Sequence, residues 1–313
     1  MSIVFMGSPE FAVVSLRKLL QAGLPVSAVV SQPDRPRGRG RKVQPTAVSA
    51  FAQQEQIPLF RPQRLRNEEI RMQLSSFNPD LFIVVAYRIL PRAMLAVPHR
   101  GSINLHGSLL PHYRGAAPIQ HALLNGDVQT GLTTFLLDER IDTGGILQQE
   151  QVVIHPDDDY GSLQSRMAEQ GARLLLESVQ QYLAGDLQPV SQPAGEYTAA
   201  PKIGTADRLL SWQQSANMLN NRIRALSPVP GAHCHLDNNQ LTLFAAEVVE
   251  QTITEMPGTI LQTGKNGILV ACTKNALLIK ELQLKGRKRM AASSFLNGYK
   301  LSPGMILSDG VTG

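Results

Sequence analysis

The sequence predicts an α/β domain with a doubly wound, mostly parallel sheet, followed by a smaller domain built as an OB-like β-barrel. The first half of the chain alternates short apolar runs with segments of helical period, which is typical of strands and helices in a parallel sheet. Beyond residue 228 the period falls to two and turn residues separate short strands, as in small barrels. The length of 313 residues also favours two domains, because a single hydrophobic core rarely grows that large.

Each element of the first half has its own local signal. The apolar run Ile3–Met6 predicts a buried strand, and Ser8 followed by Pro9 predicts the capped start of a helix. The continuous apolar run Leu81–Ala86 predicts a strand that is covered on both faces. The same alternation predicts further strands at 26–30, 102–106, 132–137 and 146–153, and further helices at 44–55, 67–76, 118–125 and 161–183.

A change in composition marks the expected domain boundary. Glycines and prolines between residues 185 and 206 interrupt any regular element, which predicts a linker. A helix at 213–225 follows, and the barrel strands are expected at 241–244, 258–261, 267–271 and 276–279. The predicted division is a first domain at 1–184, a linker at 185–206 and a second domain at 207–313.

The net charge is +5, and positive side chains gather in two glycine-containing loops. The first cluster contains Arg35, Arg37, Arg39, Arg41 and Lys42, and the second contains Lys285, Arg287, Lys288 and Arg289. Most such runs are solvated loops, but a basic, glycine-rich loop can also follow a phosphate backbone. Both interpretations stay open from the residues alone, and the second predicts a nucleic-acid partner.

Composition excludes several classes of protein. Hydrophobic residues make up 43% of the chain and charged residues 18%, which excludes wholesale disorder. No uninterrupted apolar run approaches the roughly 18 residues that span a bilayer, and no basic segment precedes the first apolar stretch. The two cysteines, Cys234 and Cys272, form no C-x-x-C motif. We therefore expect a cytoplasmic protein in a reducing compartment, without a membrane partner.

Common cofactor motifs are absent from the strand-to-helix turns. The first turn, Gly7-Ser8-Pro9, lacks the later glycines of G-x-G-x-x-G, and no Walker-type motif occurs. His233 and His235 share one face of a strand, but no further ligands accompany them, so no metal site is expected. Polar residues gather instead at 104–111 and 138–145, at the carboxyl ends of strands, where α/β sheets bind their ligands.

Three residues of these segments form a candidate catalytic group. Asn104 and His106 lie two apart on a strand and therefore face the same side. An amide donor beside an imidazole can hold an oxyanion and move a proton, and Asp142 would orient the imidazole if it lies close. The alternative is a buried Asn and His that bond to the backbone, with Asp142 capping a turn. The spacing alone leaves both interpretations open.

The longest motif covers 104–119, which reads Asn-Leu-His-Gly-Ser-Leu-Leu-Pro-His-Tyr-Arg-Gly-Ala-Ala-Pro-Ile, and Asp142-Thr143-Gly144 follows further on. This signature resembles that of the 10-formyltetrahydrofolate-dependent formyltransferases. The segments 32–42, 222–232, 285–290 and 295–298 are similar to the branch of that family that formylates methionine on initiator tRNA. The resemblance covers nearly the whole chain.

The resemblance implies a Rossmann-like sheet, an OB-like barrel and roles for matching positions. Asn104, His106 and Asp142 match the catalytic trio of the family. The segment that matches the folate site is Ser108, Leu109, Leu110 and Pro111. The two basic clusters match the parts that contact tRNA. The implied substrates are 10-formyltetrahydrofolate and methionyl initiator tRNA, without a metal, and the implied reaction is direct attack of the amine through a tetrahedral oxyanion.

Two segments depart from the family pattern. Residues 86–91 read Ala-Tyr-Arg-Ile-Leu-Pro, which is one residue shorter than the usual loop and lacks its glycine. Residues 210–212 read Leu-Ser-Trp where the family has Ile-Asp-Trp.

Two other functions compete with this one. The first is a formyltransferase that acts on a sugar-nucleotide amine, and the basic clusters argue against it because a small acceptor does not need them. The second is a tRNA-binding protein with an inactive α/β domain, and the intact trio of Asn104, His106 and Asp142 argues against that.

Overall fold

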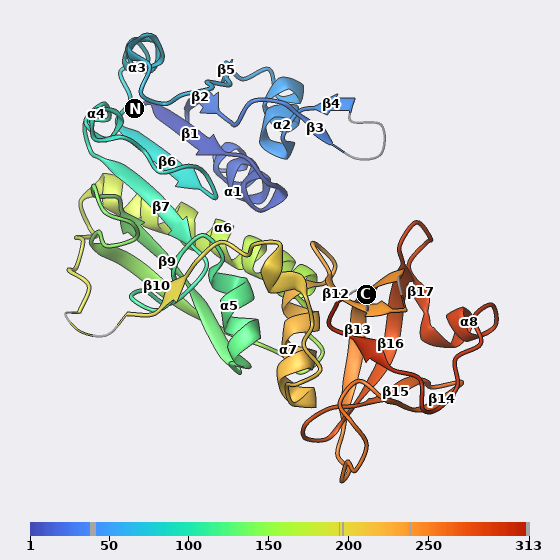
Figure 1. Cartoon of the computed structure of the whole chain (residues 1–313). Coiled ribbons are helices and arrows are strands. Elements are labelled where there is room, and N and C mark those ends of the chain that lie inside the picture. The colour runs from blue at the N-terminus through green and yellow to red at the C-terminus, as the bar shows by residue number, and fades with distance from the viewer. Residues whose placement is uncertain (38–41, 194, 196, 238, 311–313) are drawn as a thin grey trace. The chain divides into compact units, whose positions relative to one another are not determined.

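The computed structural model describes residues 1–37, 42–193, 195, 197–237 and 239–310 (Figure 1). The chain forms two compact units that interleave along the sequence. Unit 1 consists of Met1–Pro118, Gln129–Val153 and Gln164–Ala200, and unit 2 consists of Ile119–Val128, Ile154–Leu163 and Pro201–Gly313. Among the described residues, none of the helices combines the length and the apolar character that a membrane span requires.

One seven-stranded sheet forms the frame of unit 1. Its strands are β1 (Ile3–Gly7), β2 (Val26–Val30), β5 (Leu59–Phe60), β6 (Leu81–Val85), β7 (Ser102–His106), β9 (Gln129–Leu136) and β10 (Ile146–Val153). They lie in the order β10-β9-β7-β6-β1-β2-β5. The strands from β7 to β5 run parallel. At one edge of the sheet β9 pairs antiparallel with β7, and β10 pairs antiparallel with β9. The predicted mostly parallel sheet is confirmed.

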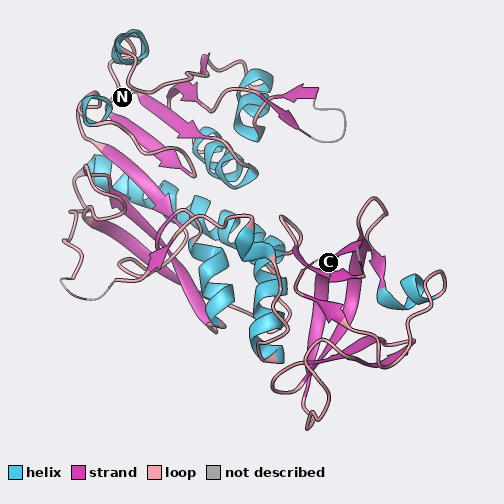
Figure 2. Cartoon of the chain, in the orientation of Figure 1, coloured by secondary structure: helices cyan, strands magenta, loops and turns pink. Residues whose placement is uncertain are grey.

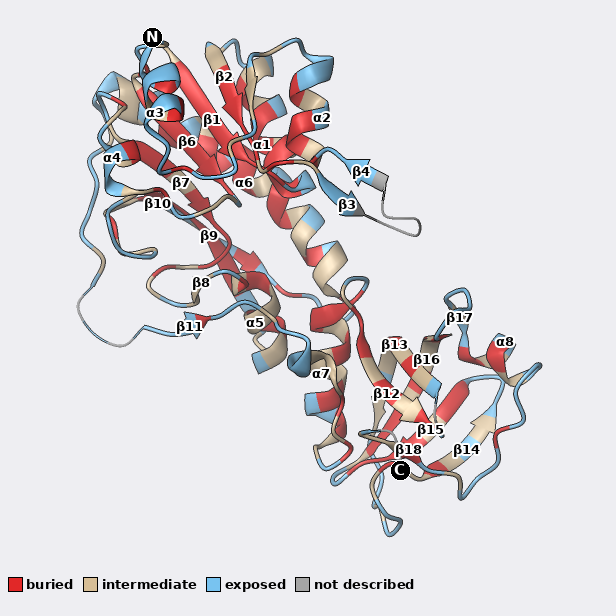
Figure 3. Ribbon diagram, turned by 45° about the horizontal axis from the view of Figure 1, so that its top comes forward, coloured by how far each residue is buried: buried red, intermediate tan, exposed pale blue. Residues whose placement is uncertain are grey.

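Helices alternate with the strands along the chain, at the expected places apart from a short helix at Arg92–Leu95 (Figure 2). They are α1 (Glu10–Gln21), α2 (Ala47–Gln54), α3 (Glu68–Ser75), α4 (Arg92–Leu95), α5 (Pro118–Asn125) and α6 (Tyr160–Ala184). α6 approaches β7 at Gly171, where an added Cβ would lie 2.8 Å from the Leu105 side chain. On the opposite face, Leu74 of α3 and Met94 of α4 pack in one buried cluster with Val84. Both faces of the sheet are therefore covered, and β1 and β6 are buried throughout (Figure 3).

The start of the first helix differs from the prediction. α1 begins at Glu10, and its N-cap is Pro9, with no side-chain cap. Ser8 is buried instead, and its hydroxyl accepts hydrogen bonds from the Gln32 backbone N–H at 3.2 Å and from Ser31 Oγ at 3.4 Å. The capping prediction is wrong because Ser8 links the ends of β1 and β2.

Two pairs of very short strands could not be predicted from the periodicity of the sequence. β3 (Arg35–Arg37) and β4 (Lys42–Gln44) form an antiparallel hairpin where the sequence indicated only a loop. β8 (Arg114–Gly115) pairs in parallel with β11 (Ala199–Ala200), and Figure 3 shows the two strands side by side. Strands of two or three residues carry no readable alternation, so only contacts between distant segments reveal them.

Unit 2 is built on one curled antiparallel sheet. Its strands are β12 (Ala232–Leu236), β13 (Asn239–Val249), β14 (Ile260–Gly264), β15 (Gly267–Ala271), β16 (Ala276–Leu284), β17 (Met290–Ala291) and β18 (Leu307–Ser308). The order is β14-β15-β16-β13-β12-β18, with β17 beside β16. An isolated bridge between Thr259 and Ile306 joins the two ends of the sheet. The Leu307 N–H donates to the Gly258 carbonyl there at 2.9 Å. This closure confirms the predicted barrel.

A helix and a tryptophan fill the core of unit 2. α7 (Ala216–Leu226) packs Leu219 and Ile223 into one buried cluster with Trp212. Asp309 accepts hydrogen bonds from Ser211 Oγ at 2.8 Å and from the Trp212 backbone N–H at 3.1 Å. The resemblance would place an aspartate at residue 211, and here a carboxylate from the end of the chain reaches that serine. The remaining short helices are η1 (Ala206–Arg208) and α8 (Ala292–Leu296).

Candidate functional site

The candidate site lies at the carboxyl end of β7. Asn104 pairs in register with Val84 of β6 on one side and with Phe135 of β9 on the other. His106 lies two residues on and therefore on the same face as Asn104, opposite the face that carries Leu105. The structure thus places both polar side chains on one face of a central strand, as the sequence predicted.

His106 is held by the loop that follows β7. Its Nε2 lies 2.9 Å from the Tyr113 carbonyl oxygen, and its ring meets the edge of Phe135 at a centroid distance of 6.4 Å. A carbonyl oxygen only accepts hydrogen bonds, so Nε2 must carry the proton of this contact. Nδ1 is then the nitrogen left for chemistry, and it lies 3.8 Å from Asp142 Oδ2.

Asp142 reaches His106 from the turn that follows β9. Its side chain is 12% exposed beside an imidazole that is 7% exposed, and its Oδ2 also accepts a hydrogen bond from the Gly115 N–H at 2.8 Å. The turn is closed by Thr143 Oγ1, which donates to the Asp138 carboxylate at 2.7 and 2.8 Å. Asp142 is thus fixed between two loops and faces the free nitrogen of His106. The structure brings the predicted trio together.

The amide of Asn104 remains available to a substrate. The residue is half-buried, and its side chain has no hydrogen-bond partner within the part of the chain that the structure describes. Its amide atoms are accessible to solvent, so a ligand in the site can form hydrogen bonds with them. Among the described residues Asn104 makes no side-chain bond to the backbone, whereas His106 does, at the Tyr113 carbonyl.

Three residues in the loops around the trio have a left-handed backbone. Ala86, Tyr113 and Asp142 have φ angles of +47°, +59° and +53°, and these residues follow β6, β7 and β9. A non-glycine residue in this left-handed region costs on the order of 1–3 kcal/mol and persists where the surroundings over-determine it. Four other described non-glycine residues elsewhere in the chain share this conformation, so it does not by itself mark the site.

The predicted folate segment runs beside the same strands. Thr133 Oγ1 donates to the Ser108 carbonyl at 2.6 Å and accepts from the Leu110 N–H at 3.1 Å. Gln149 Nε2 donates to the Leu110 carbonyl at 3.0 Å. Leu109 lies over Gly131 of β9, where a Cβ would come within 2.4 Å of its side chain. Ser108, Leu109, Leu110 and Pro111 are therefore fixed to β9 and β10, directly after His106.

The shortened loop at 86–91 is closed by an arginine. Arg88 donates to the Pro62 carbonyl at 2.8 Å, to the Gln63 carbonyl at 3.0 Å and to the Tyr87 hydroxyl at 3.0 Å. Burial raises the pKa of Tyr87, and the Arg88 contact partly opposes that rise. The arginine that replaces the expected glycine thus ties this loop to the segment after β5.

The described residues of the two basic clusters lie in a turn or at strand ends. Lys285, Arg287 and Lys288 are exposed in the turn between β16 and β17. Arg37 ends β3 and Lys42 begins β4. Arg39 and Arg41 lie outside the described residues. None of these positions tests what the clusters bind, so their contact with nucleic acid stays a prediction.

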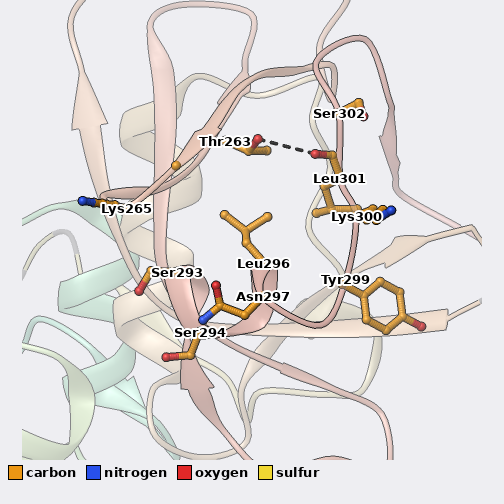
Figure 4. Close-up of a pocket in the computed structure, with 11 residues that line it drawn as sticks. Thr263, Lys265, Ser293, Ser294, Leu296, Asn297, Tyr299, Lys300, Leu301 and Ser302 are labelled. Atoms are coloured by element: carbon orange, nitrogen blue, oxygen red, sulfur yellow. Dashed lines mark hydrogen bonds between the residues drawn. The ribbon is translucent and has the colours of Figure 1, made fainter.

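The remaining candidate groups lie in unit 2. Burial raises the pKa values of Cys234 and Cys272 to about 12, which makes both poor nucleophiles. Among the described residues no group of three His, Cys, Asp or Glu side chains could hold a metal ion. A polar cavity of about 620 Å³ is lined by Lys265, Ser293, Lys300 and neighbours (Figure 4). None of the predicted site residues lines this cavity.

Some contacts of the site were missed by sequence reasoning. The Tyr113 carbonyl and the Gly115 N–H are backbone groups, so their residue types give no signal. Gln192 donates from Nε2 to the Asp142 carbonyl at 2.9 Å, although it lies fifty positions further along the chain. The segment around it was predicted as a linker, and nothing in its composition indicates that it reaches the site.

The chain is similar to known proteins over nearly its whole length. Residues 1–179 match the formyl transferase family, and residues 202–300 match the formyl transferase C-terminal domain. Methionyl-tRNA formyltransferase from Geobacter sulfurreducens is 43% identical over 98% of this chain and 96% of its own length. The enzyme of that name from Symbiobacterium thermophilum is 46% identical over 98% of this chain and 95% of its own.

Solved structures share the fold at much lower identity. WlaRD, a sugar 3N-formyl transferase crystallised in the presence of dTDP and 5-N-formyl-THF, has a TM-score of 0.66 and 16% identity, covering 92% of this chain and 99% of its own. HypX from Aquifex aeolicus, in complex with tetrahydrofolic acid, has a TM-score of 0.63 and 17% identity, covering 94% of this chain and 46% of its own. The two domain matches and the nearly full-length identity with the curated relatives show that the chain belongs to the formyl transferase family.

Proposed function

We propose that the protein transfers the formyl group of 10-formyltetrahydrofolate to the α-amine of methionine carried by initiator tRNA. The observation that carries this function is the 40–46% identity, over nearly the whole chain, with proteins named methionyl-tRNA formyltransferase. The arrangement of Asn104, His106 and Asp142 supports it, because an amide donor, an imidazole and a carboxylate meet at one strand end.

The reaction is a direct transfer between two nitrogens. The amine nitrogen of methionine attacks the formyl carbon, and the carbonyl oxygen becomes an oxyanion in the tetrahedral intermediate. The bond between the formyl carbon and N10 of the folate then breaks. The amine gives up one proton and N10 gains one, so the reaction needs neither an enzyme-bound acyl group nor a redox partner.

Each member of the trio has a distinct task in this step. The unpartnered amide of Asn104 donates to the developing oxyanion, a contact typically worth about 3 kcal/mol. His106 moves the proton through Nδ1, since Nε2 is held by the Tyr113 carbonyl. Asp142 stabilises the imidazolium that forms when Nδ1 accepts the proton, because an opposite charge nearby favours the charged form.

The folate binds through the segment that follows β7. Ser108, Leu109, Leu110 and Pro111 leave β7 immediately after His106, and their anchoring to Thr133 and Gln149 gives the folate a rigid wall. A preformed wall beside the reacting groups lowers the entropy cost of aligning the formyl carbon.

The tRNA binds through the two basic clusters. Lys285, Arg287 and Lys288 are exposed on one turn and have no acidic partner within the part of the chain that the structure describes. Arg289 beside them differs, because it pairs with Glu281 and packs on the Phe244 ring. Free cations of this kind bind phosphates by releasing condensed counterions. A tRNA substrate places the reaction in the cytoplasm.

A formyl-transfer assay with the full chain tests this function. The protein is supplied with 10-formyltetrahydrofolate and methionyl initiator tRNA, and formylmethionine is released from the tRNA and measured. Uncharged tRNA and an amino-sugar nucleotide serve as alternative acceptors in parallel reactions. Formylation of the sugar nucleotide but not of the methionyl-tRNA would overturn the proposal, and tRNA binding without any transfer would identify a binding protein instead.

A further inference from the structure

A segment outside the predicted site crosses both loops that hold the trio. We call it the strap, and it consists of residues 189–193 and 197–200, all of which belong to unit 1. At one end Val190 forms a two-way backbone bridge with Ile146 of β10, at 2.7 and 2.8 Å. At the other end β11 pairs with β8, and the Ala117 N–H donates to the Ala200 carbonyl at 3.1 Å.

Gln192 lies in the middle of the strap and joins the two loops. Its Nε2 donates to the carbonyl of Asp142 at 2.9 Å and to the carbonyl of Gly144 at 3.0 Å. Its Oε1 accepts from Arg114 Nη2 at 2.5 Å. Carbonyls only accept and a guanidinium only donates, so these three contacts fix the orientation of the amide. The side chain uses both of its donor hydrogens on the Asp142 turn and its acceptor on the 113–117 loop.

The neighbouring strap residues reinforce the same junction. Thr198 Oγ1 accepts from the Tyr113 N–H at 2.7 Å, and the Thr198 carbonyl accepts from the Arg114 N–H at 2.9 Å. The Arg114 guanidinium lies over the Tyr197 ring at 5.1 Å. Tyr113 supplies the carbonyl that holds His106, so the strap contacts the backbone supports of two members of the trio.

We infer that Gln192 is a positioning residue for formyl transfer, and this inference rests on the proposed function. Both Tyr113 and Asp142 have positive φ angles, so their loops relax unless other contacts hold them. Gln192 holds the two loops at a fixed separation and thereby keeps Asp142 Oδ2 facing Nδ1 of His106. A misplacement of about 1 Å in such a group can cost about a hundredfold in rate.

The contacts of Gln192 predict that its loss affects the position of Asp142 more than the folding of unit 1. Gln192 is only half-buried, and water can reach the two carbonyls and the guanidinium when its amide is removed. The backbone bridge at Val190 and the β8–β11 pairing remain in place without it. Loss of the amide therefore changes where Asp142 lies more than whether the unit folds.

The test compares three variants of the full chain. Gln192→Ala removes all three hydrogen bonds. Gln192→Glu keeps an acceptor for Arg114 but loses both donors and brings a carboxylate to two carbonyl oxygens. Gln188→Ala is the matched control, because Gln188 is an exposed glutamine whose amide donates to the nearby Gly185 carbonyl. We expect kcat to fall about tenfold to a hundredfold in both Gln192 variants, while KM for the folate and for tRNA changes less than about threefold.

A further readout distinguishes positioning from general damage. In Gln192→Ala the Gly115 amide, which donates to Asp142 Oδ2, should exchange its hydrogen about tenfold faster. The control Gln188→Ala should leave this exchange unchanged.

The outcomes separate this inference from the proposed function. If the unmodified protein formylates no methionyl-tRNA, the proposed function fails, and the Gly115 exchange still reports on the strap. If Gln192→Ala keeps kcat within about twofold with unchanged Gly115 exchange, the inference is overturned. A fall in kcat equal in Gln192→Ala and Gln188→Ala would also overturn it, because the effect would then not depend on the Asp142 turn.

Discussion

The chemistry of the site depends on how few hydrogen-bond partners its side chains have. His106 uses Nε2 on the Tyr113 carbonyl and keeps Nδ1 free, while the amide of Asn104 lies half-buried with no partner among the described residues. A donor that has no protein partner is available when charge develops on a substrate. This is why we place the oxyanion at Asn104 and the proton at His106.

Removal of either group should affect the chemical step. Asn104→Ala and His106→Ala are each expected to lower kcat about a hundredfold or more, which corresponds to about 2.7 kcal/mol of transition-state stabilisation. His99→Ala is the control, because this exposed histidine precedes the amino end of β7 and its Nε2 lies 2.8 Å from Asn78 Oδ1. Steady-state kinetics with methionyl-tRNA checks the expectation. A wild-type kcat in either test variant would show that the oxyanion lies elsewhere.

At the scale of the element, the turn after β9 depends on Gly144. A Cβ at this position would lie 1.7 Å from the Leu136 carbonyl oxygen, which no side-chain movement can relieve. Gly144→Ala should therefore displace the turn and Asp142 with it, and we expect kcat to fall at least about tenfold. Gly310→Ala, where a Cβ meets nothing within 4 Å, should leave kcat unchanged. Circular dichroism and kinetics on both variants make the comparison, and full activity in Gly144→Ala would contradict it.

His233 of β12 is expected to make the stability of unit 2 depend on pH. Burial lowers the pKa of His233 from 6.5, with smaller contributions from Arg208 and His235. Below about pH 6.5 the unfolded chain therefore takes up a proton that the folded chain resists, and the free energy of unfolding falls with falling pH. His233→Gln should reduce this fall. Urea unfolding at about pH 5.5 and about pH 7.5 measures it, and an equal fall in the two proteins would assign the effect to other groups.

At the scale of the whole molecule, binding of a large anionic substrate should depend on charge away from the trio. Replacing Lys285, Arg287 and Lys288 with Ala should raise KM for tRNA and leave KM for the folate unchanged. The slope of log affinity against log salt should become shallower by about one unit for each phosphate that the protein no longer binds. Arg64→Ala with Arg66→Ala removes two exposed cations as a control. If the triple variant and the Arg64/Arg66 control bind tRNA with equal affinity and equal salt slope, the turn at 285–288 is not a tRNA-binding surface.

The two compact units determine where the chain can be truncated. The predicted division into 1–184, 185–206 and 207–313 stays a prediction, and the two compact units interleave along the sequence. The predicted linker is divided at Ala200, with the strap in unit 1 and the residues after it in unit 2. A chain that ends near Leu183 would lack the strap and its hydrogen bond to Asp142. A test of the division should therefore retain residues through Ala200.

What could be predicted from the sequence rests on local signals. The apolar run of β6 and the helical period of α6 depend on near neighbours along the chain, so the parallel sheet and the barrel were predictable. Asn104 and His106 share a face because side chains along a strand alternate between the two faces of the sheet, and this pattern also depends only on near neighbours. The long motif at 104–119 indicated the family to which the chain belongs, and the domain matches confirmed it.

The tertiary structure alone decided how the site is held together. Asp142 meets Gly115 across twenty-seven positions, and Gln192 meets Asp142 across fifty. Asp309 reaches Trp212 across ninety-seven, in place of the carboxylate that the family pattern puts next to that tryptophan. Such contacts involve backbone atoms or single polar side chains from distant segments, which leave no periodicity or composition to read. The hydrogen bonds that orient a catalytic group form only when packing of the whole unit brings those segments together, and for that reason the strap was predicted as a linker.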